Sequence, residues 1–377
     1  MFQFPVYTPP DFTAAGLINA PAAATAQAPA DGVLPDNFHA TSNHPEYVHL
    51  GGGDWLLAGD TRMDAVFILR ERELMVVEPR LVKRGDPVVV GRRENGEDGI
   101  YLHTTGFNHS GDAIDKFAFR TRGNRETPFS RSYDELYGLL RHERDHGCIV
   151  WVLGPAVAFD RDSREAMAGL IESGYCHVLL AGNALATHDL EAARFRTGLG
   201  QDIYTQELVR GGHYHHLEII NEVRRHGSMA AASRALGLHD GIIHACLHQG
   251  IPYVLAGSIR DDGPLPEVVT DSCRAQDAMR FHTKRATTVI ALATQLHAIA
   301  VGNMISGYRV LAGGLIRPVY FYIVDMSEFA ADKLANRGSS QTKAIMTNAQ
   351  DFMVNLWHNL RQELTPPEAA GKEGAAP

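Results

Sequence analysis

The chain contains 377 residues, 45% of them hydrophobic, and its formal net charge is −9 with histidine neutral. Because this length exceeds what one hydrophobic core usually supports, we expect two domains. The negative charge and the lack of a run of lysine or arginine argue against nucleic acid as a partner. The four cysteines form no CxxC pair, which argues against a zinc ribbon or a disulfide framework and favours a cytoplasmic protein.

Neither a signal peptide nor a membrane span is predicted. The first residues, "MFQFPVYTPPDF", lack the basic region and apolar core of a signal peptide. The most apolar later stretch, "TTVIALATQLHAIAVG", is interrupted by Gln295 and His297. We therefore expect no membrane partner.

Two terminal segments, residues 1–37 and 363–377, are expected to be flexible. The stretch "APAAATAQAPADGVL" (20–34) and the tail "TPPEAAGKEGAAP" are rich in Ala and Pro and poor in large apolar side chains. Such segments bury too little apolar surface to offset the entropy of ordering.

Residues 38–128 are predicted to form a small strand-rich domain. Its runs "EYVHLGG", "WLLAGD", "AVFILRERELMVV" and "DPVVVGRR" are short, and Gly, Asp or Pro bounds each of them. This pattern is typical of strands joined by tight turns. The polar stretch from residue 103 to 130 indicates a connecting or active-site segment.

Residues 129–362 are predicted to form a larger α/β domain. Apolar runs typical of buried strands lie at 148–154, 176–182, 251–257, 287–293, 319–325 and 343–348. Stretches of helical period lie at 163–174, 215–227 and 349–360, the second with Leu217, Ile220 and Val223 on one face. Continuous apolar strands that alternate with helices are typical of a parallel sheet covered on both faces.

The ends of these strands indicate a ligand site. In parallel sheets ligands bind beyond the carboxyl ends of the strands. Gly182 and Gly257 leave room there for a phosphate or ribose, and helices that start after Asn183 and Thr294 would point N–H groups at anionic oxygens. Asp325 stands where an acid commonly binds ribose hydroxyls. These features favour a dinucleotide site, although strand-Gly-helix junctions also occur for packing alone and no GxGxxG follows any strand.

Adjacent carboxylates follow the apolar run "YVLAG", where Asp261 and Asp262 precede Gly263. Two like charges at a strand end are costly unless a cation binds or the pair shares a proton, which favours a functional site. The structural alternative is a solvated turn in which these acids pair with Arg260 or Arg280.

Histidines cluster in "GGHYHHLE", which contains His213, His215 and His216. The spacing matches no known zinc pattern, so we predict no metal and expect this segment to cap a helix or contact a ligand. Cys246 is predicted to be a core residue rather than a nucleophile. His297 lies on an otherwise apolar stretch, where a hydrogen-bonded core histidine is the alternative to a ligand contact.

The motifs, taken in order, resemble the archaeal-type ornithine cyclodeaminase family. The resemblance is carried by "NHPEYV", "RMDAVFI", "KRGDPVVVG", "LLAGNALATHDLEAA", "GGHYHHLEIIN", "VLAGSIRDDGPLPEVVTD", "ATQLHAIAVGNM", "VDMSE" and "RGSSQTKAIMTN", and it runs from His39 to Leu360. The same family forms the C-terminal half of cyanobacterial enzymes that degrade arginine to proline. It has also been described as related to lysine-ketoglutarate reductase/saccharopine dehydrogenase.

The resemblance implies an NAD-binding domain similar to deoxyhypusine synthase, preceded by a small domain that helps to form the substrate pocket. It also implies a homo-oligomer, a dimer or a tetramer. Transferred to matching positions, the NAD contacts are Asn183, Ala184, Asp262, Thr294, Gln295, Leu296, His297, Asp325, Gly338 and Ser339.

The implied activity is conversion of L-ornithine to L-proline and ammonia through a transient hydride transfer to NAD. This cycle needs an acid–base group, anionic groups for the distal ammonium and a cation for the carboxylate. The candidates for proton transfer and ammonium binding are Asp261, Asp262, His213 and His216. The candidates for other substrate contacts are Arg260, Arg120, Asn43 and His44.

Several motifs depart from the family pattern, most of them where substrate contacts are expected. The sequence has "TRGNRETPFSRSYDEL" in place of a Ser/Glu-rich linker, "QLHAIA" in place of "MLHSIA", and "VDMSE" in place of "VDINP". Two alternatives therefore stay open. One is an NAD-dependent dehydrogenase or lyase for another amino acid or an opine-like or saccharopine-like derivative, and the other is a non-catalytic NAD-binding regulator.

Overall fold

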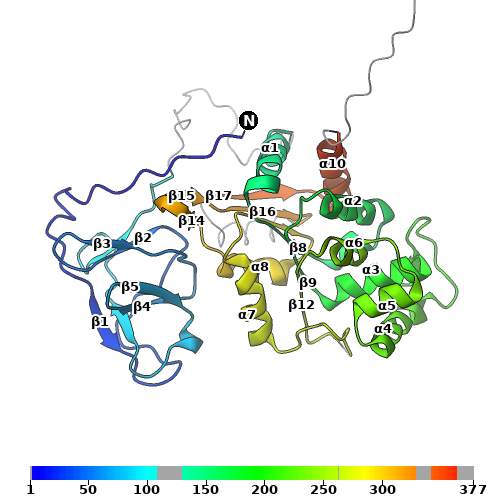
Figure 1. Cartoon of the computed structure of the whole chain (residues 1–377), viewed down its shortest axis with the longest axis horizontal. Helices are drawn as coiled ribbons and strands as arrows, with labels where there is room; N and C mark the ends of the chain where they lie inside the picture. The colour runs from blue at the N-terminus through cyan, green and yellow to red at the C-terminus, as the bar shows by residue number, and fades with distance from the viewer. Residues whose placement is uncertain (1, 108–129, 262, 328–340, 363–377) are drawn as a thin grey trace, which may run out of the picture.

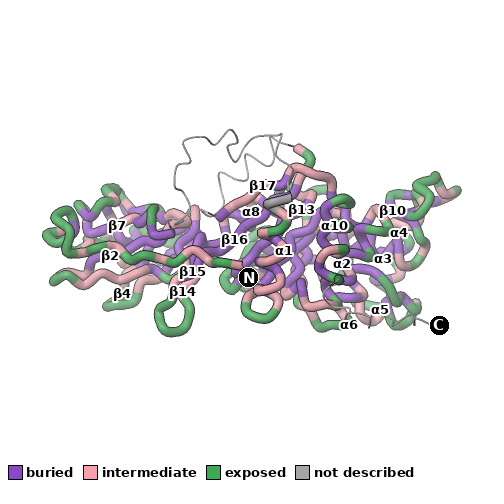
Figure 2. Tube along the Cα trace, turned by 90° about the horizontal axis from the view of Figure 1, so that it is seen from above, coloured by how far each residue is buried: buried purple, intermediate pink, exposed green. Residues whose placement is uncertain are grey.

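The structure, a computed structural model, describes residues 2–107, 130–261, 263–327 and 341–362. It has a strand-rich unit at one end and a larger α/β unit at the other (Figure 1). Figure 2 shows buried residues running through both units, so each has a core of its own. The predicted combination of a small strand-rich unit and a parallel-sheet α/β unit is confirmed.

The strand-rich unit contains two antiparallel sheets. The first has the order β1-β6-β4-β5 and the second has the order β3-β2-β7. Val48, Phe67 and Ile100 are buried together between them. The strands are β1 (Ala24–Gln27), β2 (Glu46–His49), β3 (Trp55–Leu57), β4 (Val66–Arg70), β5 (Glu73–Val77), β6 (Pro87–Val90) and β7 (Ile100–Leu102).

The expectation that residues 1–37 are flexible is wrong for much of this segment. Strand β1 pairs along its whole length with β6, and Ala28 beyond it is buried. Near the chain start, the Tyr7 hydroxyl lies 2.8 Å from His103 Nδ1. An edge strand is stabilised mainly by backbone hydrogen bonds and needs few large apolar side chains, so composition alone underestimated its order.

The α/β unit is built on a six-stranded sheet with the order β12-β9-β8-β13-β16-β17, in which every neighbouring pair is parallel. Numbered along the chain from β8, this order is 3-2-1-4-5-6. The chain therefore builds the sheet outward from β8 in one direction and then returns to β13 on the other side. The strands are β8 (Ile149–Leu153), β9 (Val178–Gly182), β12 (Tyr253–Ala256), β13 (Thr288–Leu292), β16 (Tyr320–Asp325) and β17 (Gln341–Met346).

Helices cover both faces of this sheet. Successive strand residues point to opposite sides, so an entirely apolar strand presents an apolar surface on each face. Trp151 joins the core beneath α1, α2, α3 and α10, whereas Val150 and Val152 join the core beneath α7 and α8. The helices are α1 (Ser130–His146), α2 (Arg161–Glu172), α3 (Asn183–Phe195), α4 (His215–His226), α5 (Met229–Leu236), α6 (Ile242–Gln249), α7 (Ser272–Thr283), α8 (Gln295–Met304) and α10 (Ala349–Arg361).

Short elements complete the described structure. They are the 3-10 turns η1 (Pro79–Leu81), η2 (Pro155–Ala158), η3 (Gly212–Tyr214) and η4 (Ala312–Gly314), and the short strands β10 (Thr197–Gly198), β11 (Gln201–Asp202), β14 (Tyr308–Val310) and β15 (Ile316–Pro318). Among the residues described, no helix has the length and apolarity needed to cross a membrane.

Individual helical predictions differ in outcome. Phe352, Leu356 and Leu360 form the buried face of α10, within the stretch 349–360 that was predicted to be helical. On α4, Ile220 and Val223 are buried but Leu217 is exposed; the buried face includes Ile219, which lies about 160° from Leu217 around the helix. Cys246 is fully buried, and burial raises the pKa of its thiol to about 12, which supports the predicted core role.

A buried ion pair lies in the strand-rich unit where it meets α7. Arg62 is only 2% exposed, and its Nη2 lies 2.6 Å from the carboxylate of Glu78. The same guanidinium donates to the backbone oxygens of Val76 and Asp60. A charge that is almost completely buried is tolerated only when it is paired and hydrogen-bonded, and the guanidinium of Arg62 meets both conditions.

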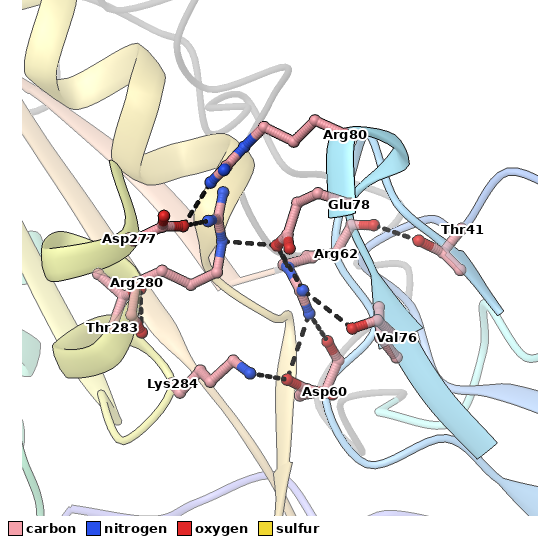
Figure 3. Close-up of polar contacts among 10 residues, drawn as sticks. All are labelled: Thr41, Asp60, Arg62, Val76, Glu78, Arg80, Asp277, Arg280, Thr283 and Lys284. Atoms are coloured by element: carbon pink, nitrogen blue, oxygen red, sulfur yellow. Dashed lines mark hydrogen bonds and ion pairs between the residues drawn. The ribbon is translucent and has the colours of Figure 1, made fainter. Parts of the chain in front are cut away.

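This pair extends across the junction between the two units (Figure 3). The Nε of Arg280, on α7, lies 2.6 Å from Glu78. Arg280 also donates to Asp277, which pairs with Arg80 from the strand-rich unit. Arg280 is thus engaged by Glu78 and Asp277, so the alternative in which it pairs with the acids after β12 is not seen among the described residues.

Candidate functional site

The strand order reverses between β8 and β13, which pair side by side up to their carboxyl ends. The backbone N–H of Gly154 donates to Leu292 O at 2.9 Å, directly after these strands. A Cβ on Gly154 would lie 1.9 Å from Ala293 O, so only glycine fits this close approach. In sheets of order 3-2-1-4-5-6, dinucleotides bind at this switch point.

A second glycine stands at the end of β9. A Cβ on Gly182 would lie 3.0 Å from Cε1 of His297, so the imidazole of α8 packs directly over the glycine. Gly182 is also the N-cap of α3 and offers no side-chain cap. The first N–H groups of α3 therefore keep their capacity to bind an anionic oxygen.

Asp261 is held close to the start of α3. Its Oδ2 accepts a 2.7 Å hydrogen bond from the backbone N–H of Ser258, and its Oδ1 lies 3.4 Å from Nδ2 of Asn183. Asn183 is fixed in turn, because its Oδ1 accepts from the N–H of Leu265 at 3.0 Å. The carboxylate is thus oriented without an arginine partner among the described residues.

The Asp261 carboxylate affects the pKa of two histidines. Burial lowers the pKa of His297, and Asp261 acts in the opposite direction. Burial also lowers the pKa of His216, where His188 adds to the effect while Glu191 and Asp261 oppose it. A neutral imidazole beside a carboxylate can accept a proton near neutral pH.

A group of possible metal ligands lies beside this site. Ligand atoms of His188, Glu191 and His216 all lie within 4.8 Å of one another. Both oxygens of Glu191 already accept hydrogen bonds, one from His188 and one from Thr197. This geometry fits a hydrogen-bonded chain better than a metal coordination sphere. The expectation that the protein binds no metal stays a prediction.

The other predicted cofactor contacts lie at the same edge of the sheet. Ala184 and Thr294 are half-buried, and Gln295 and Leu296 are exposed in the first turn of α8. Asp325 ends β16 and accepts from the N–H of Ser327 at 2.8 Å. Predicted residues that lie outside the described part of the chain are Arg120, Asp262, Gly338 and Ser339.

The predicted substrate residues Asn43 and His44 lie at the opposite edge within one chain. Asn43 O accepts from Gly307 N, and Gly307 O accepts from the N–H of Val319, the residue before β16. Asp325 is at the opposite end of that strand, about 17 Å from its first residue, Tyr320. The structure therefore does not bring Asn43 and His44 together with the strand-end candidates.

Two further candidates are solvent-exposed. Arg260 is exposed, and its backbone N–H donates to the Ser258 hydroxyl. His213 is exposed in η3, where its ring packs on Tyr214. Neither is oriented toward Asp261 by a hydrogen bond in the described structure, and their proposed roles stay predictions.

Sequence reasoning missed the buried polar side chains of α3. His188 and Glu191 are 5% and 0% exposed, respectively. The available signal was "NALATHDLEAA", which puts polar residues on several sides of a helix that directly follows a buried strand. A helix buried on most sides has to satisfy such groups internally, so their spacing of three residues was informative.

Comparison with known proteins agrees with this geometry. A family model described as "Arginine dihydrolase ArgZ-like, C-terminal, Rossmann fold" matches residues 137–356. The ornithine cyclodeaminase of Methanopyrus kandleri is 40% identical over 346 residues, which cover 89% of this chain and 77% of the relative. The chain belongs to the archaeal-type ornithine cyclodeaminase family. A second member, from Archaeoglobus fulgidus, is 38% identical over 89% of this chain and 78% of its own.

Solved structures support membership of the ornithine cyclodeaminase family. A conserved putative LOR/SDH protein from Methanococcus maripaludis has a TM-score of 0.82 at 35% identity and matches 92% of this chain and 100% of its own. AgrE, in a ternary complex with ornithine and NAD+, has a TM-score of 0.57 at 31% identity over 92% of this chain and 47% of its own. This chain therefore spans about half of AgrE. The predicted family is confirmed, and its named members are enzymes.

Proposed function

We propose that this protein is an NAD-dependent ornithine cyclodeaminase that converts L-ornithine to L-proline and ammonia. The observation that carries the proposal is the convergence of Asp261, His216 and His297 beyond the carboxyl ends of a 3-2-1-4-5-6 sheet. Dinucleotides bind at this edge in sheets of this order, and the edge also carries acid–base groups. The names of the family members supply the substrate.

The residues at this edge fit NAD. Gly154 allows the backbone of Ala293 to approach closely, Gly182 allows the ring of His297 to approach closely, and the start of α3 has N–H groups without a side-chain cap. We propose that NAD binds through the contacts transferred from the family, namely Asn183, Ala184, Asp262, Thr294, Gln295, Leu296, His297, Asp325, Gly338 and Ser339. An arrangement similar to deoxyhypusine synthase accounts for the lack of a GxGxxG sequence.

When bound, NAD would accept a hydride from the α-carbon of ornithine and return it to the cyclic imine that forms after ammonia leaves. The protein has to remove a proton from the α-ammonium before hydride transfer. It also has to remove one from the δ-ammonium, because the free δ-amine is the group that closes the ring. His216 is the candidate acceptor, because burial favours its neutral form. Asp261 offers a fixed anionic group for an ammonium.

Oligomerisation and cellular location are further parts of the proposal. We propose a cytoplasmic homo-oligomer with an amino acid as its small-molecule substrate. The separation of Asn43 and His44 from Asp325 within one chain supports a site shared between copies. Light scattering of the purified protein measures the oligomeric state, and a monomer at assay concentration would contradict the proposed homo-oligomer.

The proposed activity is tested by incubating the protein with NAD and a panel of amino acids while ammonia, proline and NADH are followed together. Ammonia and proline from ornithine, without accumulated NADH, are expected. NADH that accumulates with another amino acid would replace the proposal with the dehydrogenase alternative. Bound NAD with no turnover would favour the non-catalytic regulator.

Gly182→Ala is expected to weaken NAD binding roughly tenfold, equivalent to about 1.4 kcal/mol. The backbone at Gly182 has a φ of −100°, so alanine adds no strain there, but its Cβ displaces the His297 ring. Calorimetric titration with NAD measures the change. Gly59→Ala is the control, since a Cβ there meets nothing within 4 Å. Equal affinities in both variants would remove Gly182 from the NAD site.

A further inference from the structure

A buried hydrogen-bonded chain runs from α3 toward the surface beside the proposed active site. Glu191 Oε2 accepts from His188 Nδ1 at 2.8 Å, and Glu191 Oε1 accepts from the Thr197 hydroxyl at 2.9 Å. The Thr197 oxygen lies 2.8 Å from His215 Nδ1. Glu191 and Thr197 are at most 1% exposed. The chain is therefore shielded from water at its centre.

The direction of each hydrogen bond follows from the donors available. An ionised carboxylate only accepts, so His188 carries a proton on Nδ1 and Thr197 gives its single hydroxyl proton to Glu191. His215 Nδ1–H must then donate to the Thr197 oxygen. The carboxylate thus fixes the orientation of both His188 and Thr197.

His216 lies between this chain and Asp261. Its ring centroid is 5.0 Å from that of His188, with the planes tilted by 31°. Its Nδ1 is buried and has no hydrogen-bond partner in the described structure. The charged or titratable groups that face it are His188 and Glu191 from α3 and Asp261 from the segment after β12. His216 therefore depends on these neighbours for its protonation state.

A purely structural role does not account for this arrangement. A buried pair of ionisable groups usually contributes little net stability, because desolvation offsets the attraction. Such pairs beside a titratable group in a cleft are more typical of functional sites. Packing of α3 would have been satisfied equally well by apolar side chains of similar volume.

We propose that His188 and Glu191 are positioning residues that set the charge and orientation of His216 for proton transfer. This inference rests on the proposed function for its place in a reaction. Glu191 holds His188 through the hydrogen bond to its Nδ1, and His188 places its imidazole against the ring of His216. Thr197 extends the chain without contributing charge.

The test compares His188→Asn with the double variant His188→Asn/Glu191→Gln. Asn keeps a donor near the Nδ1 position but removes the imidazole that lowers the pKa of His216, while Glu191, which raises it, stays; this pKa is therefore expected to rise. The double variant removes both ionisable groups, whose effects on His216 oppose each other, and keeps hydrogen-bonding groups, so this pKa is expected to return toward that of the wild type. Carbon-13 NMR of labelled histidines measures it, with His216→Gln used to assign the signal.

Activity gives a second readout. If neutral His216 is the proton acceptor, the acidic limb of kcat/KM moves to higher pH in His188→Asn and moves back in the double variant. At a pH below the limb, kcat/KM is expected to fall roughly tenfold for each unit of displacement. Thr197→Val is the matched control, because it breaks the chain without changing charge and should leave the limb in place.

Several outcomes would overturn the inference. One is an unchanged or lower pKa of His216 in His188→Asn, and another is a double variant that departs further from the wild type than the single one. A metal ion bound at one per chain and lost in His216→Gln would also contradict it. The NMR result is independent of turnover, so expected NMR shifts with no ornithine turnover would reject the proposed function and not this inference.

Discussion

Replacing Asp261 with Asn is expected to lower kcat/KM for ornithine by at least about 100-fold. Asn has nearly the same shape, and its Oδ1 can still accept from the N–H of Ser258, so the loop after β12 is expected to keep its conformation. What the variant loses is the negative charge available to an ammonium group of the substrate. Steady-state kinetics with saturating NAD measures the effect.

Asp271→Asn provides a matched control for this charge change. Asp271 is the N-cap of α7, its side chain accepts from Arg274 N, and Asn caps helices equally well. The activity of the Asp271→Asn variant is expected to stay within about twofold of the wild type, since surface substitutions that keep such a cap have small effects. Full activity in Asp261→Asn would transfer the role to Asp262 or to one of the histidines.

Glu78→Gln is expected to lower the free energy of unfolding by about 3 kcal/mol. Gln cannot balance the charge of Arg62, which is 2% exposed, and it also breaks the ion pair with Arg280 across the junction. Asp60 retains part of the compensation for Arg62. Urea denaturation of both proteins at neutral pH measures the difference.

The pH dependence of this effect has a definite sign. Burial raises the pKa of Glu78, but Arg62 and Arg280 outweigh it and the net pKa is lowered. A carboxyl group with a lowered pKa in the folded state contributes stability at neutral pH, and that stability is lost as acid protonates it. The difference between wild type and Glu78→Gln should therefore shrink as the pH falls below about 4.

Asp277→Asn tests whether burial is the cause. Asp277 belongs to the same network, but its side chain is 48% exposed. Exposed ion pairs contribute at most about 1 kcal/mol, so this variant should lie close to the wild type. Equal destabilisation by Asp277→Asn and Glu78→Gln would show that the junction is stabilised by net charge and not by the buried pair.

Local pattern was enough to predict the elements of the larger unit. The runs around Trp151, Leu180 and Ile290 are continuous apolar stretches, and each became a strand buried on both faces. Periodicity also predicted α10. It failed for Leu217, because the buried face of α4 is centred on Val223 and includes Ile219, which lies about 160° from Leu217 around the helix.

Residues 24–27 show a second limit of composition. The stretch "ATAQ" has no large apolar side chain, yet it forms an edge strand. Its stability comes from backbone hydrogen bonds to β6, a partner more than 60 residues away in sequence, as the pairing of Ala24 with Val90 shows. No local signal reports such a partner.

The sequence by itself determined the family, the class of fold and the strand ends at which Asn183, Asp261 and His297 stand, because these depend on short motifs and local periodicity. Only the tertiary structure decided the 3-2-1-4-5-6 order, the distance of Asn43 from that edge and the grouping of His188 and Glu191 beside His216. Those features depend on which elements pack together, and packing is a property of surfaces that are assembled from residues far apart along the chain.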